Sequence, residues 1–205
     1  GQFGSDTIPQ IKEAIRQLGF ADVYEVALGA DIVAYHEAAE LTERKEKGEK
    51  MTSSCCPAFV NMVRKHFPGM LPFVSTTVSP MIAAERYIRS QNPDVVTVFI
   101  GPCIAKKNEA MAHYIDELNY VLTFEELYAM LCAAGVPSSI DAAGEEAATR
   151  YGKGFALSGG VTAAVNRVLE EQSKPAATAL PCNGAEECRK AMMLLKAGRL
   201  GEDFI

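Results

Sequence analysis

The sequence predicts an α/β fold with mostly parallel sheets, and two features of the chain predict it. Short apolar runs alternate with amphipathic stretches along most of the 205 residues. Several of the amphipathic stretches end at a glycine, as helices commonly do. The chain is 48% hydrophobic and can bury a sizeable core, so we expect one large domain or two small lobes.

The two patterns place the elements in order along the chain. Stretches with apolar residues three and four positions apart predict helices at 7–19, 30–48, 57–69, 79–91, 124–135, 161–172 and 184–198. Short apolar runs between them predict strands at 23–29, 95–101, 119–124, 153–160 and 176–182. Residues 134–154 are rich in small and polar side chains, which predicts a long loop or a lobe boundary.

The charge and the N-terminal composition exclude several classes of function. The net charge is -6 and the chain has no run of Lys and Arg, so nucleic acid and anionic membranes are not expected partners. There is no pattern of a secretory signal peptide and no apolar run long enough to cross a bilayer. We therefore expect a cytoplasmic protein without a membrane span.

Six cysteines carry the strongest chemical signal. In a reducing compartment they favour thiol chemistry or metal ligation over a disulfide framework. Cys55 and Cys56 are poor partners for each other, because adjacent Cα atoms lie about 3.8 Å apart and disulfides usually begin at about 4.4 Å. Cys132 lies on an apolar helical stretch, where we expect a buried core thiol.

Three cysteine sites occupy equivalent places in the expected fold. Cys55 and Cys56 fall at a helix start, with a serine at 53 or 54 able to cap the helix and Pro57 suited to its first turn. Cys103 and Cys182 each follow an expected strand and open a helix. Helix N-termini lower thiol pKa values, and open α/β sheets bind ligands beyond the carboxyl ends of their strands. The pattern predicts a cofactor crevice, although the spacing names no metal.

Several segments together resemble the catalytic, H-cluster domain of iron-iron hydrogenases. They are TSSCCPAF at 52–59, GPCIAKKNE at 101–109, GQFG at 1–4, STTVSP at 75–80 and FALSGGV at 155–161. The resemblance covers essentially the whole chain. It implies an α/β fold of two intertwined lobes, each a small, mostly parallel sheet flanked by helices, with the cofactor crevice between them. Residues 1–50 and 151–205 would form one lobe and residues 51–150 the other.

The resemblance also implies a cofactor and residues that hold it. In the family, four cysteines hold a 4Fe-4S cluster, and one of them bridges to a diiron site that carries CO, cyanide and a dithiolate. Cys56 and Cys103 match two of these ligands, and Cys55 matches the thiol that exchanges protons with the diiron site. Lys106 matches the donor to a cyanide ligand, and Glu109 belongs to the same motif. Pro80 and Phe155 match residues that line the diiron pocket.

A set of polar residues resembles the family's proton channel. Glu37, Glu40 and Arg44 fall at i, i+3 and i+7, so they share one face of the expected helix. In isolation such a face is usually a solvated ion-pair surface. However, these three residues together with Ser75 match the channel that leads outward from the proton-exchanging cysteine, which implies an active proton path beside Cys55.

The chain also departs from the family. Gly101 stands where the family usually has methionine, Met81 where it has glutamine, and Ala156 where it has glycine. The third cysteine signature of the family, which supplies the other two cluster ligands, is absent. Cys182 and Cys188 could in principle substitute, but Cys188 lies six residues further on, inside an expected helix, and matches no family ligand. We therefore expect a fragment of a longer protein that is inactive alone and holds the cluster weakly or not at all.

Three hypotheses follow from the resemblance. The first is a hydrogenase that oxidises hydrogen reversibly to protons and electrons, with ferredoxin or accessory iron-sulfur domains as electron partners. The second is a hydrogen- or redox-sensing module with slow turnover and a signalling domain beyond residue 205, which the altered pocket residues favour. The third is an iron-sulfur scaffold without a diiron site, and the retained Cys55 and proton-channel residues count against it.

Overall fold

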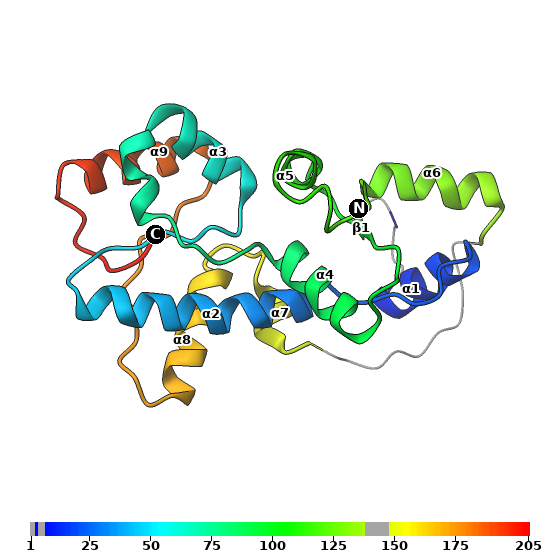
Figure 1. Cartoon of the computed structure of the whole chain (residues 1–205), viewed down its shortest axis with the longest axis horizontal. Helices are drawn as coiled ribbons and strands as arrows, with labels where there is room; N and C mark the ends of the chain where they lie inside the picture. The colour runs from blue at the N-terminus through cyan, green and yellow to red at the C-terminus, as the bar shows by residue number, and fades with distance from the viewer. Residues whose placement is uncertain (1–2, 4–6, 138–147) are drawn as a thin grey trace. The chain divides into compact units, whose positions relative to one another are not determined.

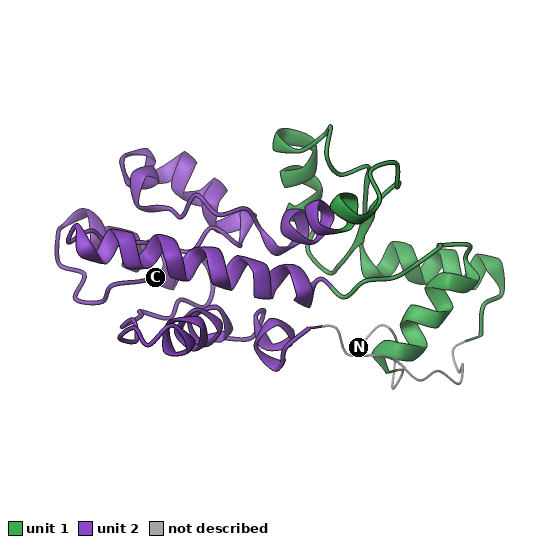
Figure 2. Ribbon diagram, turned by 60° about the horizontal axis from the view of Figure 1, so that its bottom comes forward, with its two compact units in different colours: residues 1–25, 88–147 green, residues 26–87, 148–205 purple. Residues whose placement is uncertain are grey.

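The computed structural model describes residues 3, 7–137 and 148–205 (Figure 1). The chain forms two compact units (Figure 2). Unit 1 contains residues 1–25 and 88–147, and unit 2 contains residues 26–87 and 148–205. Each unit therefore combines two stretches that are far apart in the sequence. Among the described residues, no helix is both long and apolar enough to cross a membrane.

Unit 1 is built around a short parallel sheet. Strands β1 (Val98–Ile100) and β2 (Tyr120–Leu122) pair in parallel, with Phe99 opposite Val121. Helix α5 (Ala105–His113) connects them, as parallel neighbours require. Helices α1 (Ile8–Gln17) and α6 (Phe124–Ala134) supply a hydrophobic core in which Ala14 and Ile15 meet Leu127 and Leu131. A capping box between Thr123 and Glu126 fixes the start of α6.

Unit 2 is organised by one long helix, α2 (Ala27–Glu46), which packs along α8 (Gly160–Glu171) and the short α7 (Arg150–Gly154) (Figure 1). A second group of helices contains α3 (Pro57–His66), the 3-10 helix η1 (Pro68–Phe73) and α9 (Ala185–Lys196). Helix α4 (Pro80–Gln91) continues from unit 2 into unit 1.

Strand pairing in the described part of unit 2 is limited to isolated parallel bridges. Phe204 bridges to both Met51 and Ala179, and Thr52 bridges to Val74. Met51 and Phe204 are fully buried in a core cluster with Ala38 and Leu41 of α2. These bridges hold residues 51–55 against α2, which positions the candidate site.

The fold confirms the α/β class and corrects several expected elements. The strands expected at 95–101 and 119–124 are present as β1 and β2, and all seven expected helices are present. Residues 23–29 form no strand, because α2 already begins at Ala27 and Val23 packs into the core of unit 1 instead. Residues 153–160 form the end of α7, a turn and the first residue of α8, and 176–182 contribute only the bridge at Ala179.

The boundaries between the two units differ from the boundaries that we expected between the two lobes. Residues 51–87 join unit 2, because the bridges from Met51 to Phe204 and from Thr52 to Val74 tie them to the rest of that unit. The lobe boundaries stay a prediction for the complete domain. Of the loop expected at 134–154, residues 138–147 lie outside the described residues, as do all residues of the GQFG segment except Phe3.

A glycine sets the distance between α2 and α4. A Cβ atom on Gly29 would overlap the carbonyl oxygen of Pro80 and would lie 2.8 Å from the backbone nitrogen of Ala84. Both obstacles are backbone atoms, so no side-chain rotation can relieve the overlap. Gly29 therefore lets the start of α2 lie directly against the start of α4, where Pro80 stands.

Candidate functional site

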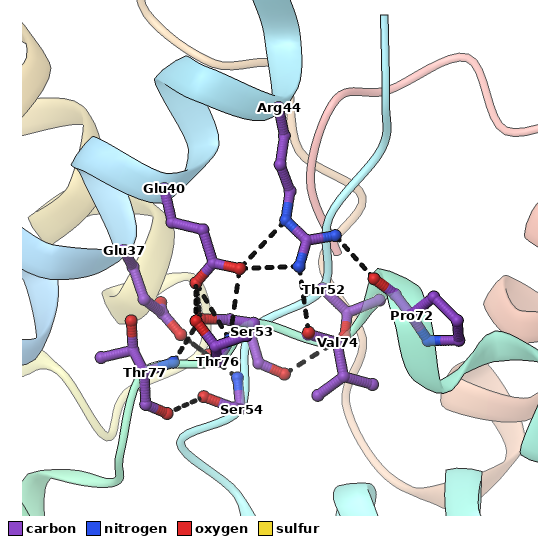
Figure 3. Close-up of polar contacts among 11 residues, drawn as sticks. Glu37, Glu40, Arg44, Thr52, Ser53, Ser54, Pro72, Val74, Thr76 and Thr77 are labelled. Carbon is purple, nitrogen blue, oxygen red and sulfur yellow. Dashed lines mark hydrogen bonds and ion pairs between the residues drawn. The ribbon is translucent and has the colours of Figure 1, made fainter. Parts of the chain in front are cut away.

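Helix α2 presents the polar face that the sequence spacing predicts. Glu37, Glu40 and Arg44 lie along one side of it, facing the segments that contain residues 52–55 and 72–77 (Figure 3). Glu37 is fully buried, although a carboxylate is rarely found there without a partner. The face is therefore an internal polar cluster, not the solvated ion-pair surface that the same spacing usually produces.

Glu40 and Arg44 form a two-pronged ion pair. The Nε and Nη2 atoms of Arg44 donate to Oε1 of Glu40 at 3.0 and 2.7 Å. The same guanidinium donates to the carbonyl oxygen of Pro72 at 2.7 Å and to that of Val74 at 3.3 Å (Figure 3). Arg44 thus ties α2 to the end of η1, and its rigid fork is suited to holding several acceptors at once.

The second oxygen of Glu40 collects donors from the 75–77 segment. The hydroxyl of Ser75 donates to Oε2 of Glu40 at 2.7 Å, and the backbone nitrogen of Thr76 donates to the same atom at 3.0 Å. Burial alone would raise the pKa of Glu40, but the hydrogen bonds from Ser75, Arg44 and Thr76 together lower it below its usual value. Glu40 is therefore a fixed anion at neutral pH.

Glu37 has the opposite electrostatic character. Its Oε1 atom accepts hydrogen bonds from the hydroxyl of Ser53 at 2.9 Å and from the backbone nitrogen of Ser54 at 3.2 Å, whereas Oε2 is buried with no hydrogen-bond partner. Burial raises the pKa of Glu37 to about 7, although the two hydrogen bonds oppose the shift. This carboxyl group can therefore gain or lose a proton near neutral pH.

Ser53 links Glu37 to Cys55. Its hydroxyl donates to Glu37 and accepts from the backbone nitrogen of Cys55 at 3.3 Å. The sequence predicted Ser53 or Ser54 as a helix cap, but α3 is capped at Cys56 without any side-chain hydrogen bond. The serine side chains are engaged elsewhere, because Ser53 contacts Glu37 and Ser54 donates to the carbonyl oxygen of Thr77.

Ser53 and Thr76 were missed as site residues in the sequence. The available signal was their closeness to matched residues, because Ser53 stands two positions before Cys55 and Thr76 directly follows Ser75. Their roles depend on two loops meeting α2, which spacing within one helix does not reveal. The structure thus brings Glu37 and Cys55 together through one residue, and brings Ser75, Glu40 and Arg44 together directly.

Cys56 is exposed at the N-cap of α3, directly before Pro57 in the first helical turn. Cys182 and Cys188 belong to the same unit, and Cys188 lies close enough to Cys56 to interact electrostatically with it. The lowered thiol pKa that helix starts usually cause is not found at Cys182. Burial raises its pKa to about 11, with Cys188 as the next contributor.

Unit 1 contains the GPCIAKKNE motif at residues 101–109. Cys103 is exposed between β1 and α5, as the sequence predicts, and the backbone nitrogen of Lys106 donates to its carbonyl oxygen at 3.1 Å. The Nζ atom of Lys106 lies 2.8 Å from Oε2 of Glu109, and both side chains are largely shielded from water. This pair is a shielded ion pair at the start of α5, close in sequence to the thiol.

Two expected pocket residues occupy different settings in unit 2. Phe155 is buried at the end of α7, in a core cluster with Ala30 and Val33 of α2 against which Cys55 also packs. Pro80 begins α4 beside Gly29. Of the residues at which this chain differs from the family pattern, Met81 is buried and Ala156 is exposed.

Cys132 corrects one sequence prediction. It is exposed, not buried, because α6 turns Leu127 and Leu131 toward α1, and the residue after Leu131 points away from that core. Its thiol lies near Tyr128, one turn earlier on α6, and their interaction raises the pKa of the Tyr128 phenol.

The thiols only partly fit an iron-sulfur cluster. Cys56 and Cys103 are exposed soft donors, which suits ligation to iron. Within residues 3, 7–137 and 148–205, however, no three His, Cys, Asp or Glu side chains converge in a way that could hold a metal ion. The two matched cysteines also belong to different units. The described residues therefore provide ligand candidates without a complete ligand set.

Comparison with protein families gives one match over the whole chain. The family model described as "Iron only hydrogenase large subunit, C-terminal domain" matches residues 1–205. Iron hydrogenase 1 of Clostridium pasteurianum is 32% identical over 189 residues, which cover 82% of this chain and 33% of that protein. The cytosolic Fe-S cluster assembly factor NAR1 of Eremothecium gossypii is 31% identical over 107 residues, which cover 51% of this chain and 24% of that protein.

A solved structure supports the fold. The [FeFe]-hydrogenase HydA1 from Chlamydomonas reinhardtii superposes with a TM-score of 0.76 over 97% of this chain and 70% of that one, at 23% sequence identity. The chain spans a third or less of the length of the two curated relatives named above.

Proposed function

The chain belongs to the family of iron-only hydrogenase large subunits, as part of their C-terminal domain, and from this premise we propose that the protein that contains it oxidises hydrogen reversibly to protons and electrons. Cys55 would exchange protons at the catalytic centre. Glu37, Ser75, Glu40 and Arg44 would form the route between that thiol and the solvent.

One observation carries the proposal: a titratable, buried carboxyl group lies one hydroxyl away from Cys55. Glu37 has a pKa of about 7 and shares the hydroxyl of Ser53 with the backbone of Cys55. Groups that move protons work best when their pKa lies near the working pH. The Oε2 atom of Glu37 has no hydrogen-bond partner, so this oxygen would be available to pass a proton onward along the proposed route to Ser75 and Glu40.

The cofactor would be the H-cluster, whose iron atoms supply hydrogen activation and electron transfer. Cys56 and Cys103 would hold its 4Fe-4S part, and Lys106, Glu109, Pro80 and Phe155 would surround its diiron part. Lys106 is already partly neutralised by Glu109, so it would act as a shielded hydrogen-bond donor. Ferredoxin or iron-sulfur domains would take up the electrons, and cysteines that serve metal ligation and proton exchange suit a reducing, cytoplasmic location.

The test is hydrogen uptake and evolution by the protein that carries this chain, reconstituted anaerobically with iron and sulfide and matured with a synthetic diiron cofactor. A Cys55→Ala variant removes the proton-exchanging thiol, and Cys132→Ala is a matched control at an exposed cysteine in unit 1. We expect fast turnover that Cys55→Ala abolishes and Cys132→Ala leaves intact. Equal turnover in both variants would contradict the role of Cys55.

A sensor remains the second candidate because of Gly101. A Cβ atom at this position would lie 2.8 Å from the ring of Phe99, so the methionine usual in the family fits only if that ring moves. The backbone just before Cys103 therefore has room for glycine but not for methionine, which would change the shape of the proposed diiron pocket. Infrared bands of CO and cyanide together with barely detectable turnover would favour the sensor over the hydrogenase.

The similarity to NAR1 raises a scaffold role, in which an iron-sulfur cluster is bound without a diiron site. A scaffold needs no proton route, and the ordered set from Cys55 to Glu37 argues against it. Absence of all diiron bands after maturation would overturn the hydrogenase and sensor proposals together and favour the scaffold.

A further inference from the structure

Ser53 is held beside α2 by hydrogen bonds on both sides of its hydroxyl group. The hydroxyl donates to Oε1 of Glu37 at 2.9 Å (Figure 3) and accepts from the backbone nitrogen of Cys55 at 3.3 Å. The backbone nitrogen of Ser53 donates to the carbonyl oxygen of Ile205 at 2.9 Å. A serine hydroxyl has one proton to donate, and here that proton is directed at Glu37.

The loop that contains Ser53 is fastened to the other segment of the site. The hydroxyl of Ser54 donates to the carbonyl oxygen of Thr77. Two residues before Thr77, the hydroxyl of Ser75 donates to Oε2 of Glu40 at 2.7 Å. Both segments are therefore tied to each other and to α2, so Ser53 meets Glu37 at a fixed place.

The two oxygens of Glu37 have different surroundings. Oε1 accepts hydrogen bonds from the hydroxyl of Ser53 and from the backbone nitrogen of Ser54, whereas Oε2 is buried with no hydrogen-bond partner. A protonated carboxyl group has one oxygen that carries the proton and one that only accepts. Two donors aimed at Oε1 favour it as the accepting oxygen, which leaves Oε2 to carry the proton.

We propose that Ser53 is a positioning residue of the proton route and not a carrier in it, because it holds Oε1 of Glu37 and leaves Oε2 as the oxygen that carries the proton. A relay hydroxyl accepts a proton from one neighbour while it releases its own to the next. The neighbour that donates to Ser53 is the amide of Cys55, and a backbone amide keeps its proton near neutral pH. The role rests on the proposed function, because the route is part of that function.

The contact with Ser53 also affects the ionisation of Glu37. Burial raises the pKa of Glu37 to about 7, and the hydrogen bond from Ser53 is the largest effect that opposes the rise. On α2 and on the facing segments 52–55 and 72–77, the charged and titratable side chains near Glu37 are Glu40, Arg44 and Cys55. Glu40 adds to the rise, and Arg44 is bonded to Glu40. Without the hydroxyl of Ser53, the pKa of Glu37 should therefore rise further.

The first test is a carboxyl titration of the whole chain by NMR, with glutamate isotope-labelled at the carboxyl carbon. The signal of Glu37 is the one that Glu37→Gln removes. We expect Ser53→Ala to make Glu37 bind its proton roughly tenfold more tightly. Ser53→Thr keeps a hydroxyl and should restore the original titration, and Ser90→Ala, at an exposed serine of α4, should leave it unchanged. An unchanged titration in Ser53→Ala would overturn the proposal.

A second measurement uses the unaltered chain and does not depend on the folding of any variant. The amide of Ser54 donates directly to Oε1 of Glu37, and the amide of Cys55 reaches the same oxygen through the hydroxyl of Ser53. Both amide NMR signals should therefore shift with pH at the midpoint of the Glu37 carboxyl. Amide signals that stay constant while Glu37 titrates would overturn the proposal as well.

Turnover separates positioning from relay. In the matured protein that carries this chain, Ser53→Ala should keep turnover and move the limb of the pH profile that belongs to Glu37 to higher pH. A loss of turnover at every pH, as we expect for Cys55→Ala, would make Ser53 a relay and contradict its positioning role. If the unaltered protein shows no turnover, the proposed function fails, while the two NMR measurements still decide whether Ser53 holds Oε1.

Discussion

Glu37 and Glu40 lie one helical turn apart on α2 and yet have opposite pKa shifts. Glu40 accepts hydrogen bonds from Ser75, Arg44 and Thr76, which outweigh its burial. Glu37 accepts only two hydrogen bonds at one oxygen, so burial dominates and raises its pKa to about 7. The number of donors that reach each carboxylate therefore separates a fixed anion from a carboxyl group that titrates near neutral pH.

Replacing Glu37 with glutamine should change how stability depends on pH. The carboxyl group of Glu37 binds its proton more tightly in the folded protein than in the unfolded chain. Its contribution to stability is therefore greatest below the unfolded pKa of 4.5 and falls as pH rises to about 7. Across this range, the free energy of unfolding loses on the order of 3 kcal/mol from this group. Glu37→Gln should remove this decline, which urea unfolding at a series of pH values between 4 and 8 would measure.

The exposed Glu43 on the same helix offers the control for that experiment. Glu43→Gln keeps the carboxyl of Glu37, so the decline between pH 4.5 and 7 should persist. A Glu37→Gln protein whose stability falls with pH as steeply as the unaltered chain would show that Glu37 is not the group responsible.

Arg44 should be sensitive even to a change that keeps its charge. Lysine offers a single ammonium group, which cannot reach Glu40 and the carbonyl oxygens of Pro72 and Val74 together. We expect Arg44→Lys to lower the free energy of unfolding by about 2 kcal/mol. Thermal unfolding would measure the change, with Arg64→Lys on the exposed side of α3 as the reference. Equal effects of the two changes would show that the positive charge of Arg44, and not the geometry of its guanidinium group, stabilises the fold.

At the scale of elements, all the expected helices form, whereas only two of the five expected strands do. The helical period within 30–48 correctly placed Glu37, Glu40 and Arg44 on one face, because such periodicity is local. The strand expected at 176–182 contributes a single bridge, because strand formation depends on partners far away in the sequence, here Phe204. For the same reason, the approach of Ser53 to Glu37 could not be predicted from spacing.

Glycine contacts between helices yield a prediction at this scale. A Cβ atom on Gly160, the first residue of α8, would overlap the carbonyl oxygen of Gly154 and lie 2.7 Å from that of Phe155. Because these obstacles are backbone atoms, Gly160→Ala should destabilise the protein by about 3 kcal/mol and displace Phe155. Gly69→Ala is the control, since a Cβ atom there meets nothing within 4 Å. Chemical denaturation would compare the two, and equal stabilities would refute the steric argument.

At the scale of the whole molecule, each unit has its own core. Among the described residues, Ala14, Ile15, Leu127 and Leu131 form the buried cluster of unit 1, and the buried clusters of unit 2 consist of residues of that unit. The alternation of strands and helices predicted the α/β class, but not which stretches share a core. The bridge from Met51 to Phe204 spans most of the chain, and no local pattern signals it.

Because each unit has its own core, we predict that a substitution in one core destabilises only the unit that contains it. Leu127→Ala opens a cavity between α6 and α1 and should cost about 3 kcal/mol within unit 1. Hydrogen exchange followed by mass spectrometry should then show lost protection in α1 and α6, with α2 and α8 nearly unchanged. Leu169→Ala, in the core of unit 2, should give the reverse pattern. If either change lowers protection evenly across both sets of helices, the chain unfolds as one cooperative body, and the proposed proton route on α2 then depends on the integrity of unit 1 as well.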